Sequence, residues 1–347
     1  MNNPSNSLMD AYRPDLIMIE DNLVAAVFSL MKIIPAQFCL QTARQSSIIA
    51  PDSVIFETSS GTMALGLAIV CRWYNYKLTI VTDPSCDYLL GRRLKDLGVR
   101  VEVVPRPAAV GGFQRARLDR LNELRMESPN SWWVNQYDNP ANAEAYRSFA
   151  EQLLKEVGRI DCFVGTVGSG GSICGTARYL RKVYPDLQVI GVDTFGSVLF
   201  GQPDKPRKLR GLGNSLLPKN LDHTIFDEVH WVSAAEAFTA TRMLHRQTTL
   251  FRGGTSGACW LVARYLAAKK KRARVVCLFP DDGNRYIETI YNDEYLRQNE
   301  LLLDQLPTGP EKVEYPSEAN CNWSFIEWAR RPYREVIGSI SARTISV

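Results

Sequence analysis

The chain has 347 residues, of which 45% are hydrophobic and 22% are charged, with a formal net charge of +4. This length and apolar content suffice for a globular protein of two domains or one large one, and they exclude a fibrous or disordered chain. The positive balance is too small and too dispersed for a nucleic-acid partner, since the densest basic cluster, Lys269 to Arg272, is of the kind that ends a helix.

The segment from Leu23 to Leu40 is nearly long enough to cross a bilayer. Lys32, Pro35 and Gln37 interrupt it, and an acidic pair rather than a basic region precedes it. We therefore interpret it as part of a folded core that contains one lysine, and we expect no membrane partner.

Lys32 is the unusual residue of this segment. An ammonium group among apolar side chains is costly to bury unless it is paired, neutralised or covalently consumed, and an imine to an aldehyde cofactor would consume it. The segment alone favours a simpler interpretation, in which the lysine lies at a helix end and extends its charged head to water. Both interpretations stay open at this point.

Beyond this segment, runs rich in β-branched residues alternate with segments of helical periodicity, which predicts an α/β fold with a mostly parallel sheet wound by helices. The expected strands are Val54 to Glu57, Leu78 to Thr82, Val99 to Val104, Cys162 to Gly165, Val189 to Asp193 and Val275 to Phe279. The expected helices are Thr62 to Tyr74, Leu89 to Leu97, Ala141 to Val157, Ser172 to Val183, Ala234 to Arg246, Ser256 to Lys269 and Arg285 to Arg297.

A glycine-rich loop, Gly165 to Ser172, joins one of these strands to a helix. Glycines let backbone N–H groups face an anion, and the helix N-terminus adds its positive end, so the loop is suited to one phosphate. No lysine follows as in nucleotide-hydrolysing loops, and the glycine spacing differs from a dinucleotide fingerprint. A tight turn without a ligand is the alternative.

The eight cysteines show no CxxC pairing, and the chain has only three histidines. We interpret the cysteines as reduced thiols of a cytoplasmic protein, and we expect neither a disulfide framework nor a metal site.

Six motifs in order carry a family resemblance, which covers the chain from about Ile17 to Leu301. The chain resembles the fold-type II pyridoxal phosphate (PLP) enzymes of the cysteine synthase and cystathionine β-synthase family. The similar segments are Glu57 to Thr62 (E-x-T-S-G-N in the family), Gln136 to Asn142 (Q-F-x-N-P-A-N), Gly168 to Ser172 (G-T-G-G-T), Gly211 to Ser215 (G-I-G-A-G), Gly253 to Ala258 (G-I-S-S-G-A) and Pro280 to Tyr286 (P-D-S-G-E-R-Y).

The resemblance implies a cofactor, pyridoxal 5'-phosphate, and assigns roles by position. Lys32 stands at the family's distance before Ser59, which makes it the Schiff-base lysine and the base that removes the α-proton. The implied cofactor-binding residues are Lys32, Thr62, Gly168, Ser169, Gly170, Gly171, Ser172 and Thr255, and the implied substrate-binding residues are Ser59, Ser60, Gly61, Gln136 and Gly211.

The resemblance also implies a two-domain fold like that of the tryptophan synthase β-subunit, and a homodimer. We expect an N-terminal domain over residues 1–145, whose first strands pack with the other domain, a C-terminal domain over 146–305, and an extension over 306–347. The aromatic residues Trp323, Phe325 and Trp328 of the extension would cover a dimer surface or the mouth of the site, or simply pack as an arm, and the last is favoured.

The expected reaction is β-replacement. An O-activated L-serine, O-phosphoserine or O-acetylserine, would lose its leaving group to give an aminoacrylate, which an amine or thiol attacks. The segments Gly111 to Phe113, Trp132 to Tyr137 and Phe195 to Gly201 resemble siderophore-pathway N-(2-amino-2-carboxyethyl)-L-glutamate synthases more than sulfide-using cysteine synthases. The closest alternative reaction is plain β-elimination by a lyase. A second alternative is a catalytically silent binding subunit, because Thr62 replaces the family asparagine and Ile33-Ile34 replace its Asp-Arg pair.

Overall fold

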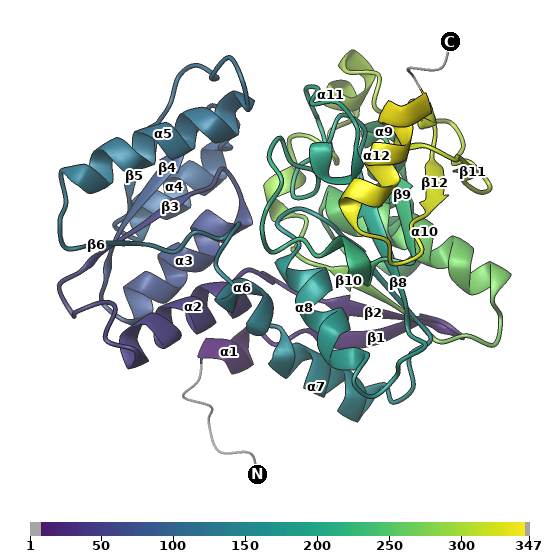
Figure 1. Ribbon diagram of the computed structural model, residues 1–347, viewed down its shortest axis with the longest axis horizontal. Helices are drawn as coiled ribbons and strands as arrows, with labels where there is room; N and C mark the ends of the chain where they lie inside the picture. Colours follow the sequence, from purple (N-terminus) through teal and green to yellow (C-terminus); the bar gives the residue numbers. More distant parts are fainter. Residues whose placement is uncertain (1–7, 344–347) are drawn as a thin grey trace.

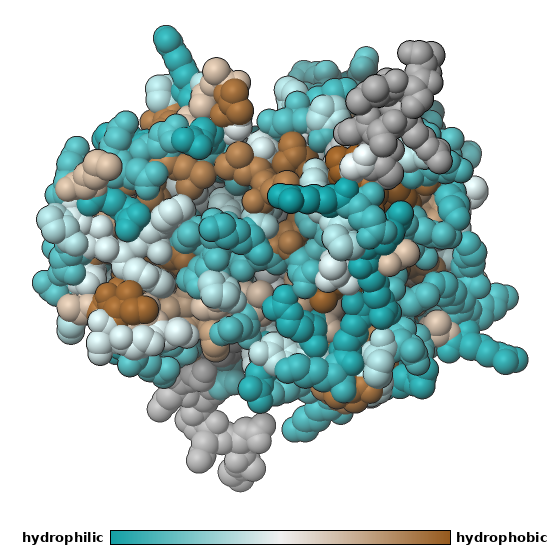
Figure 2. Space-filling model, viewed as in Figure 1, coloured by the Kyte–Doolittle hydropathy of each residue, from teal (hydrophilic) through white to brown (hydrophobic). Residues whose placement is uncertain are grey.

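The computed structural model of the protein describes residues 8–343 and contains two sheets, one in each of two lobes (Figure 1). The large lobe has an eight-stranded sheet in the order β1-β2-β10-β7-β8-β9-β12-β11, and the small lobe has a four-stranded sheet in the order β5-β4-β3-β6. The predicted α/β class with mostly parallel sheets is confirmed. On the face seen in Figure 2, a band of hydrophobic residues lies between the two lobes of an otherwise mostly hydrophilic surface.

The small sheet is parallel throughout and has helices on both faces. Its strands are β3 (Val54–Thr58), β4 (Lys77–Thr82), β5 (Arg100–Val103) and β6 (Ser131–Trp133), and its helices are α2 (Ile33–Gln45), α3 (Thr62–Trp73), α4 (Tyr88–Asp96) and α5 (Gly112–Met126). Because side chains alternate along a strand, Ile55 packs with α2 and α3 whereas its neighbour Phe56 packs under α5.

The large sheet has a central parallel part whose strands are buried on both faces. These strands are β2 (Leu23–Val27), β10 (Val275–Phe279), β7 (Cys162–Thr166), β8 (Gln188–Asp193) and β9 (Glu228–Trp231). Helices α7 (Arg147–Glu156) and α8 (Gly171–Leu180) cover one face, and α9 (Ala234–Thr248) and α10 (Gly254–Lys269) cover the other. Strand β1 (Asp15–Glu20) extends this sheet as an antiparallel partner of β2.

The remaining described elements are short except for α12, which has 11 residues. They are α1 (Leu8–Ala11), α6 (Ala141–Glu144), α11 (Asp293–Gln298), β11 (Glu311–Lys312), β12 (Ser324–Glu327), α12 (Tyr333–Arg343) and the 3-10 turns η1 (Val198–Phe200), η2 (His223–Ile225), η3 (Asn284–Tyr286) and η4 (Pro316–Glu318).

Two predicted helices are wrong in extent. The predicted helix Ala141 to Val157 is two helices, α6 and α7, because the Tyr146 N–H bonds the carbonyl of Ala143 and tightens the chain between them. The predicted helix Arg285 to Arg297 is the turn η3 followed by α11, which begins where the Asn292 side chain accepts hydrogen bonds from the N–H groups of Glu294 and Tyr295.

The apolar segment from Leu23 to Leu40 is core, as predicted, but it is not one element. It contains strand β2 of the large sheet, a crossing between the lobes, and the first half of α2. Lys32 lies at that crossing, immediately before α2. Within residues 8–343, no helix combines the length and apolar content needed to cross a membrane. Six of the eight cysteines are buried.

The C-terminal extension packs on the edge of the large sheet, as the favoured interpretation predicted. Strand β12 pairs antiparallel with β9, and Trp323 and Trp328 are buried. The Trp323 indole donates to Nδ1 of His230 at 3.1 Å, and its backbone N–H donates to Glu236 at 2.7 Å. Phe325 stacks on the His230 ring at 5.2 Å. This arm is therefore an integral part of the fold.

Replacing Trp323 should show how much the arm stabilises the protein. Trp323→Ala removes a side chain that is only 2% exposed, and it leaves a cavity and an unpaired imidazole nitrogen on His230. We expect the free energy of unfolding to fall by about 3–5 kcal/mol, measured by denaturant titration. Trp73→Ala is the matched control, because Trp73 is 58% exposed and its loss should cost less than about 0.5 kcal/mol. Equal losses for the two variants would contradict this account.

Helix α3 touches the chain at Lys32 through a glycine. A Cβ added at Gly66 would lie 2.8 Å from the carbonyl oxygen of Lys32, closer than real Cβ atoms approach backbone. Glycine therefore lets α3 and the start of α2 pack backbone against backbone. This contact helps to set the position of the Lys32 backbone relative to α3.

We predict that Gly66→Ala destabilises the protein by about 1–3 kcal/mol, because the new methyl group must push the Lys32 backbone away. Gly91→Ala in α4 is the control, since a Cβ there meets nothing within 4 Å, and alanine should stabilise that helix by about 0.5–1 kcal/mol. Thermal or denaturant unfolding checks both variants. A stable Gly66→Ala protein would show that α3 does not press on Lys32.

Candidate active site

The predicted site residues gather where the strands of both sheets end. Backbone bonds hold the crossing segment to the end of β10: the Phe28 N–H donates to the Phe279 carbonyl at 2.9 Å, and the Met31 N–H donates to the Pro280 carbonyl at 2.8 Å. Lys32 follows directly, half-buried, at the N-terminal end of α2. The lysine is thus anchored to the large sheet while its helix belongs to the small lobe.

The buried carboxylate of Glu57, near the end of β3, interacts with Lys32. Glu57 accepts hydrogen bonds from the Thr58 N–H at 2.7 Å, the Gln136 N–H at 2.9 Å and the Trp133 indole at 3.2 Å. Burial raises the pKa of Glu57 to about 7 in spite of these bonds. Burial also lowers the pKa of Lys32 to about 8, although the charge of Glu57 acts in the opposite direction. Lys32 can therefore gain and lose a proton near neutral pH.

The predicted substrate-binding residues of the small lobe form one connected loop structure. Ser59 Oγ accepts from the Gly61 N–H at 3.1 Å, and Gln136 Nε2 donates to the Thr58 carbonyl at 2.9 Å. Ser59 and Gln136 are buried, whereas Ser60 and Gly61 are half-buried. Because one Gln136 donor is committed to Thr58, its amide has one hydrogen left for a ligand.

The glycine loop forms a cradle of free backbone donors at the start of α8. The N–H groups of Gly168, Ser169, Gly170, Gly171 and Ser172 donate to no group in the described part of the chain. Gly170 has a φ of 82°, which favours glycine. Such an array at a helix N-terminus binds anions, so the loop is suited to a phosphate group.

The protein itself also requires these glycines. A Cβ at Gly170 would lie 2.7 Å from Cα of Leu221, and a Cβ at Gly171 would lie 2.5 Å from Oδ1 of Asn142. The cradle is therefore held in shape by close packing, before any ligand is considered.

Thr255 has a buried hydroxyl group that is free to bind a ligand. It lies in the first turn of α10 and is 3% exposed, and its Oγ1 has no hydrogen-bond partner among residues 8–343. A Cβ at Gly211 would lie 2.8 Å from the Thr255 methyl group, and one at Gly168 would lie 3.2 Å from the Gly211 carbonyl oxygen. The structure thus brings Thr255, Gly211 and the phosphate cradle together. Since buried hydroxyls are normally satisfied, Thr255 fits a ring nitrogen of a bound cofactor.

The two departures from the family pattern have clear structural positions. Thr62 is the first residue of α3, directly after Gly61, and is half-buried. Ile33 packs in the core of the small lobe and Ile34 in the core of the large lobe. The isoleucine pair therefore joins the two cores at the crossing where relatives carry charges.

Sequence analysis missed a buried ion pair beside the substrate loop. Arg117 on α5 binds Asp83 at 2.9 Å, and both side chains are less than a tenth exposed. Arg117 Nη1 also donates to Ser60 Oγ at 3.2 Å, while its Nε has no partner in the described structure. The sequence did contain an indication that Arg117 is buried. It lies at helical spacing from Gln114, Leu121 and Leu124, which form the buried face of α5.

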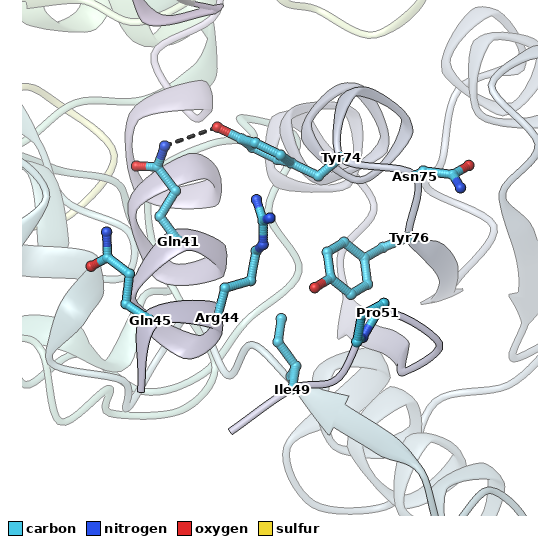
Figure 3. A pocket seen from close by; sticks show the side chains of 8 residues that line it. All are labelled: Gln41, Arg44, Gln45, Ile49, Pro51, Tyr74, Asn75 and Tyr76. Carbon is cyan, nitrogen blue, oxygen red and sulfur yellow. Dashed lines mark hydrogen bonds between the residues drawn. The ribbon is translucent and has the colours of Figure 1, made fainter. Parts of the chain in front are cut away.

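A cavity of about 590 Å³ lies elsewhere, at the C-terminal ends of α2 and α3 (Figure 3). Its lining comprises Gln41, Arg44, Gln45, Ile49, Pro51, Tyr74, Asn75 and Tyr76, none of which is a predicted site residue. Gln41 spans its edge by donating to the Tyr74 hydroxyl at 2.8 Å. The position of the site is therefore set by convergent polar groups and not by cavity size.

Comparisons with known proteins agree with this geometry. The family model described as "Pyridoxal-phosphate dependent enzyme" matches residues 30–281. The chain is 34% identical over 293 residues to an N-(2-amino-2-carboxyethyl)-L-glutamate synthase from Ralstonia nicotianae, covering 81% of this chain and 87% of that protein. It is 35% identical over 268 residues to a protein of the same name from Cupriavidus metallidurans, covering 76% of this chain and 79% of that one.

A solved structure gives the same result for the fold. The O-acetylserine dependent cystathionine β-synthase from Helicobacter pylori is 25% identical, with a TM-score of 0.75, over 84% of this chain and all of that one. The residues present fit the cofactor, with a donor cradle for its phosphate, an unpaired hydroxyl for its ring nitrogen and a lysine for its aldehyde. Because the family match spans most of its length, the chain belongs to the pyridoxal-phosphate dependent enzymes, among the fold-type II relatives of cysteine synthase, and its cofactor is pyridoxal 5'-phosphate.

Proposed function

We propose that this β-replacement synthase joins the three-carbon unit of an O-activated L-serine to the amine of glutamate. Two relatives at 34% and 35% identity carry the name of a synthase with that product. The observation that carries the choice of donor is Arg117, whose buried guanidinium contacts both Asp83 and Ser60 and keeps an unpartnered Nε. A cation at this position suits an anionic leaving group, which favours O-phosphoserine over O-acetylserine as donor.

The proposed roles follow from position and charge. Bound PLP would supply an aldehyde that reacts with the lysine amine or the substrate amine, and it would withdraw electrons from the α-carbon next to that substrate amine. Lys32 Nζ removes the α-proton, and its pKa of about 8 gives a useful neutral fraction near neutral pH. Ser59, Ser60, Gly61 and Gln136 hold the donor carboxylate, and Gly211 lines the same space.

The balance of the reaction is simple. The bond between the donor β-carbon and its oxygen breaks, and phosphate leaves with the bonding pair. A bond forms between that carbon and the acceptor nitrogen, which gives up one proton. The reaction needs no oxidant, reductant or metal.

We further propose that the enzyme is a cytoplasmic homodimer and that its parts divide at residues 145 and 305, with 306–347 as an extension. Supporting this division, the sheet of the small lobe lies wholly before residue 145, and β1 and β2 are the strands that the first part lends to the large sheet. The buried cysteines are consistent with a reducing compartment.

The function is tested with protein reconstituted with PLP. Adding O-phosphoserine or O-acetylserine should shift the visible absorbance of the cofactor to longer wavelength, and adding glutamate should reverse the shift. Mass spectrometry should then find N-(2-amino-2-carboxyethyl)-L-glutamate. Pyruvate and ammonia as the only products would instead establish β-elimination, and no spectral change with either donor would exclude both reactions.

Lys32→Ala is the control for that experiment and should give no product. Borohydride reduction of the resting wild-type protein, followed by peptide mapping, should place the pyridoxyl group on Lys32. A label on another lysine would overturn its assignment.

Arg117→Met should discriminate between the two donors. We expect kcat/KM for O-phosphoserine to fall roughly 10- to 100-fold, the value of a charge-assisted hydrogen bond, and kcat/KM for O-acetylserine to change less than about threefold. Because Asp83 loses its partner in this variant, the double variant Arg117→Met/Asp83→Asn is measured beside it. Equal losses for both donors in the double variant would mean that Arg117 only shapes the loop.

A further inference from the structure

The two lobes meet at the rim of the site through two arginines of the large lobe. Arg285 binds Asp87, the N-cap residue of α4, with contacts of 2.7 Å and 3.2 Å to Oδ2. Arg210 donates to the backbone carbonyl of Ser85. Ser85 and Asp87 belong to the short segment that follows β4 in the small lobe.

Both contacts are adjacent to predicted site residues. Arg210 directly precedes Gly211, where a Cβ would lie 2.8 Å from the methyl group of Thr255. Arg285 Nη1 lies 4.0 Å from the place of a Cβ on Gly61 in the substrate loop. Arg210 and Arg285 therefore lie beside the proposed site.

The charges at this rim do not balance. Arg117 is paired with Asp83, and Arg285 is paired with Asp87. Arg210 forms no ion pair with any carboxylate in the described part of the chain, and its one described bond goes to a neutral carbonyl. Its side chain is exposed, so its charge is available to a ligand.

We propose that Arg210 binds a carboxylate of the acceptor amino acid and so selects dicarboxylic amines over nucleophiles that have no carboxylate. This inference rests on the proposed function. The acceptor needs a free amine at the donor β-carbon, and glutamate then has carboxylates left to be recognised. A guanidinium pairs with a carboxylate through two parallel N–H donors, a stronger contact than its present bond to the Ser85 carbonyl.

The proposed role of Arg210 concerns only the step in which the acceptor binds, after the donor has lost its leaving group. The test therefore measures the donor step and the acceptor step separately. In Arg210→Gln, the rate of the absorbance shift on adding donor should stay within about twofold of wild type. The KM for glutamate should rise roughly 10- to 100-fold, as for a lost charge-assisted hydrogen bond. The KM for a nucleophile that has no carboxylate, 2-aminoethanethiol or hydrosulfide, should stay unchanged. Arg210→Lys should recover part of the glutamate affinity.

Lys208→Gln is the matched control. Lys208 lies on the same segment and is exposed, but its ammonium group donates to Asn299 and not to the small lobe. Its removal takes the same charge from the surface and should leave the KM for glutamate unchanged. An equal rise in both variants would reduce the effect to general electrostatic attraction and overturn the proposal.

Comparing the two donors distinguishes two possible roles of Arg210, which are binding the acceptor and assisting the departure of the leaving group. The rise in the KM for glutamate must appear with O-acetylserine as well as with O-phosphoserine. A rise with O-phosphoserine alone would assign Arg210 to the departing phosphate and overturn the proposal, as would an equal loss with glutamate and sulfide. If the wild-type enzyme makes the glutamate product and Arg210→Gln matches it, this inference is wrong while the proposed function stands. If the wild-type enzyme makes no glutamate product, the proposed function itself fails.

Discussion

The arrangement of the site depends on one buried carboxylate, that of Glu57. A carboxylate is expensive to bury unless donors surround it, and three groups from three separate residues, Thr58, Trp133 and Gln136, supply them. Those bonds tie the end of β3 to the chain after β6, and so place the loop proposed to hold the donor carboxylate. The same charge acts on Lys32, whose pKa would be lowered further without it. Loop geometry and lysine protonation are therefore linked through Glu57.

The position of Lys32 follows from the path of the chain. Strand β2 belongs to the large sheet and α2 to the small lobe, so the lysine lies on the segment that joins them. Close backbone contacts hold both sides: Gly66 admits α3 against the Lys32 carbonyl, and Met31 bonds the end of β10. Because its backbone is held by both lobes, Lys32 keeps its position in the site, as a base that acts on a single carbon requires.

The sequence predicted the local parts of this structure and missed the non-local ones. Loops such as Gly168 to Ser172 were predictable because glycine, hydroxyls and a following helix are neighbours in the chain. Strand β2 was missed because it continues without a polar break toward α2, so Leu23 to Leu40 was interpreted as one apolar segment, and β9 and β12 because each is only four residues long and includes charged or polar residues. The roles of Arg117 and Arg210 depend on Asp83 and Ser85, which lie distant in the chain, so no local pattern could reveal them.

The ion pair inside the small lobe is stronger than the contacts that join the two lobes at the rim of the site. Arg117 and Asp83 are both buried within the small lobe, and separating such a pair leaves a charge without water, which costs several kcal/mol. The rim contacts are weaker, since Asp87 is 31% exposed and Arg210 bonds only a carbonyl, and partly exposed pairs contribute about 1 kcal/mol or less. The rim contacts therefore cost less to break than the buried pair beside Ser60.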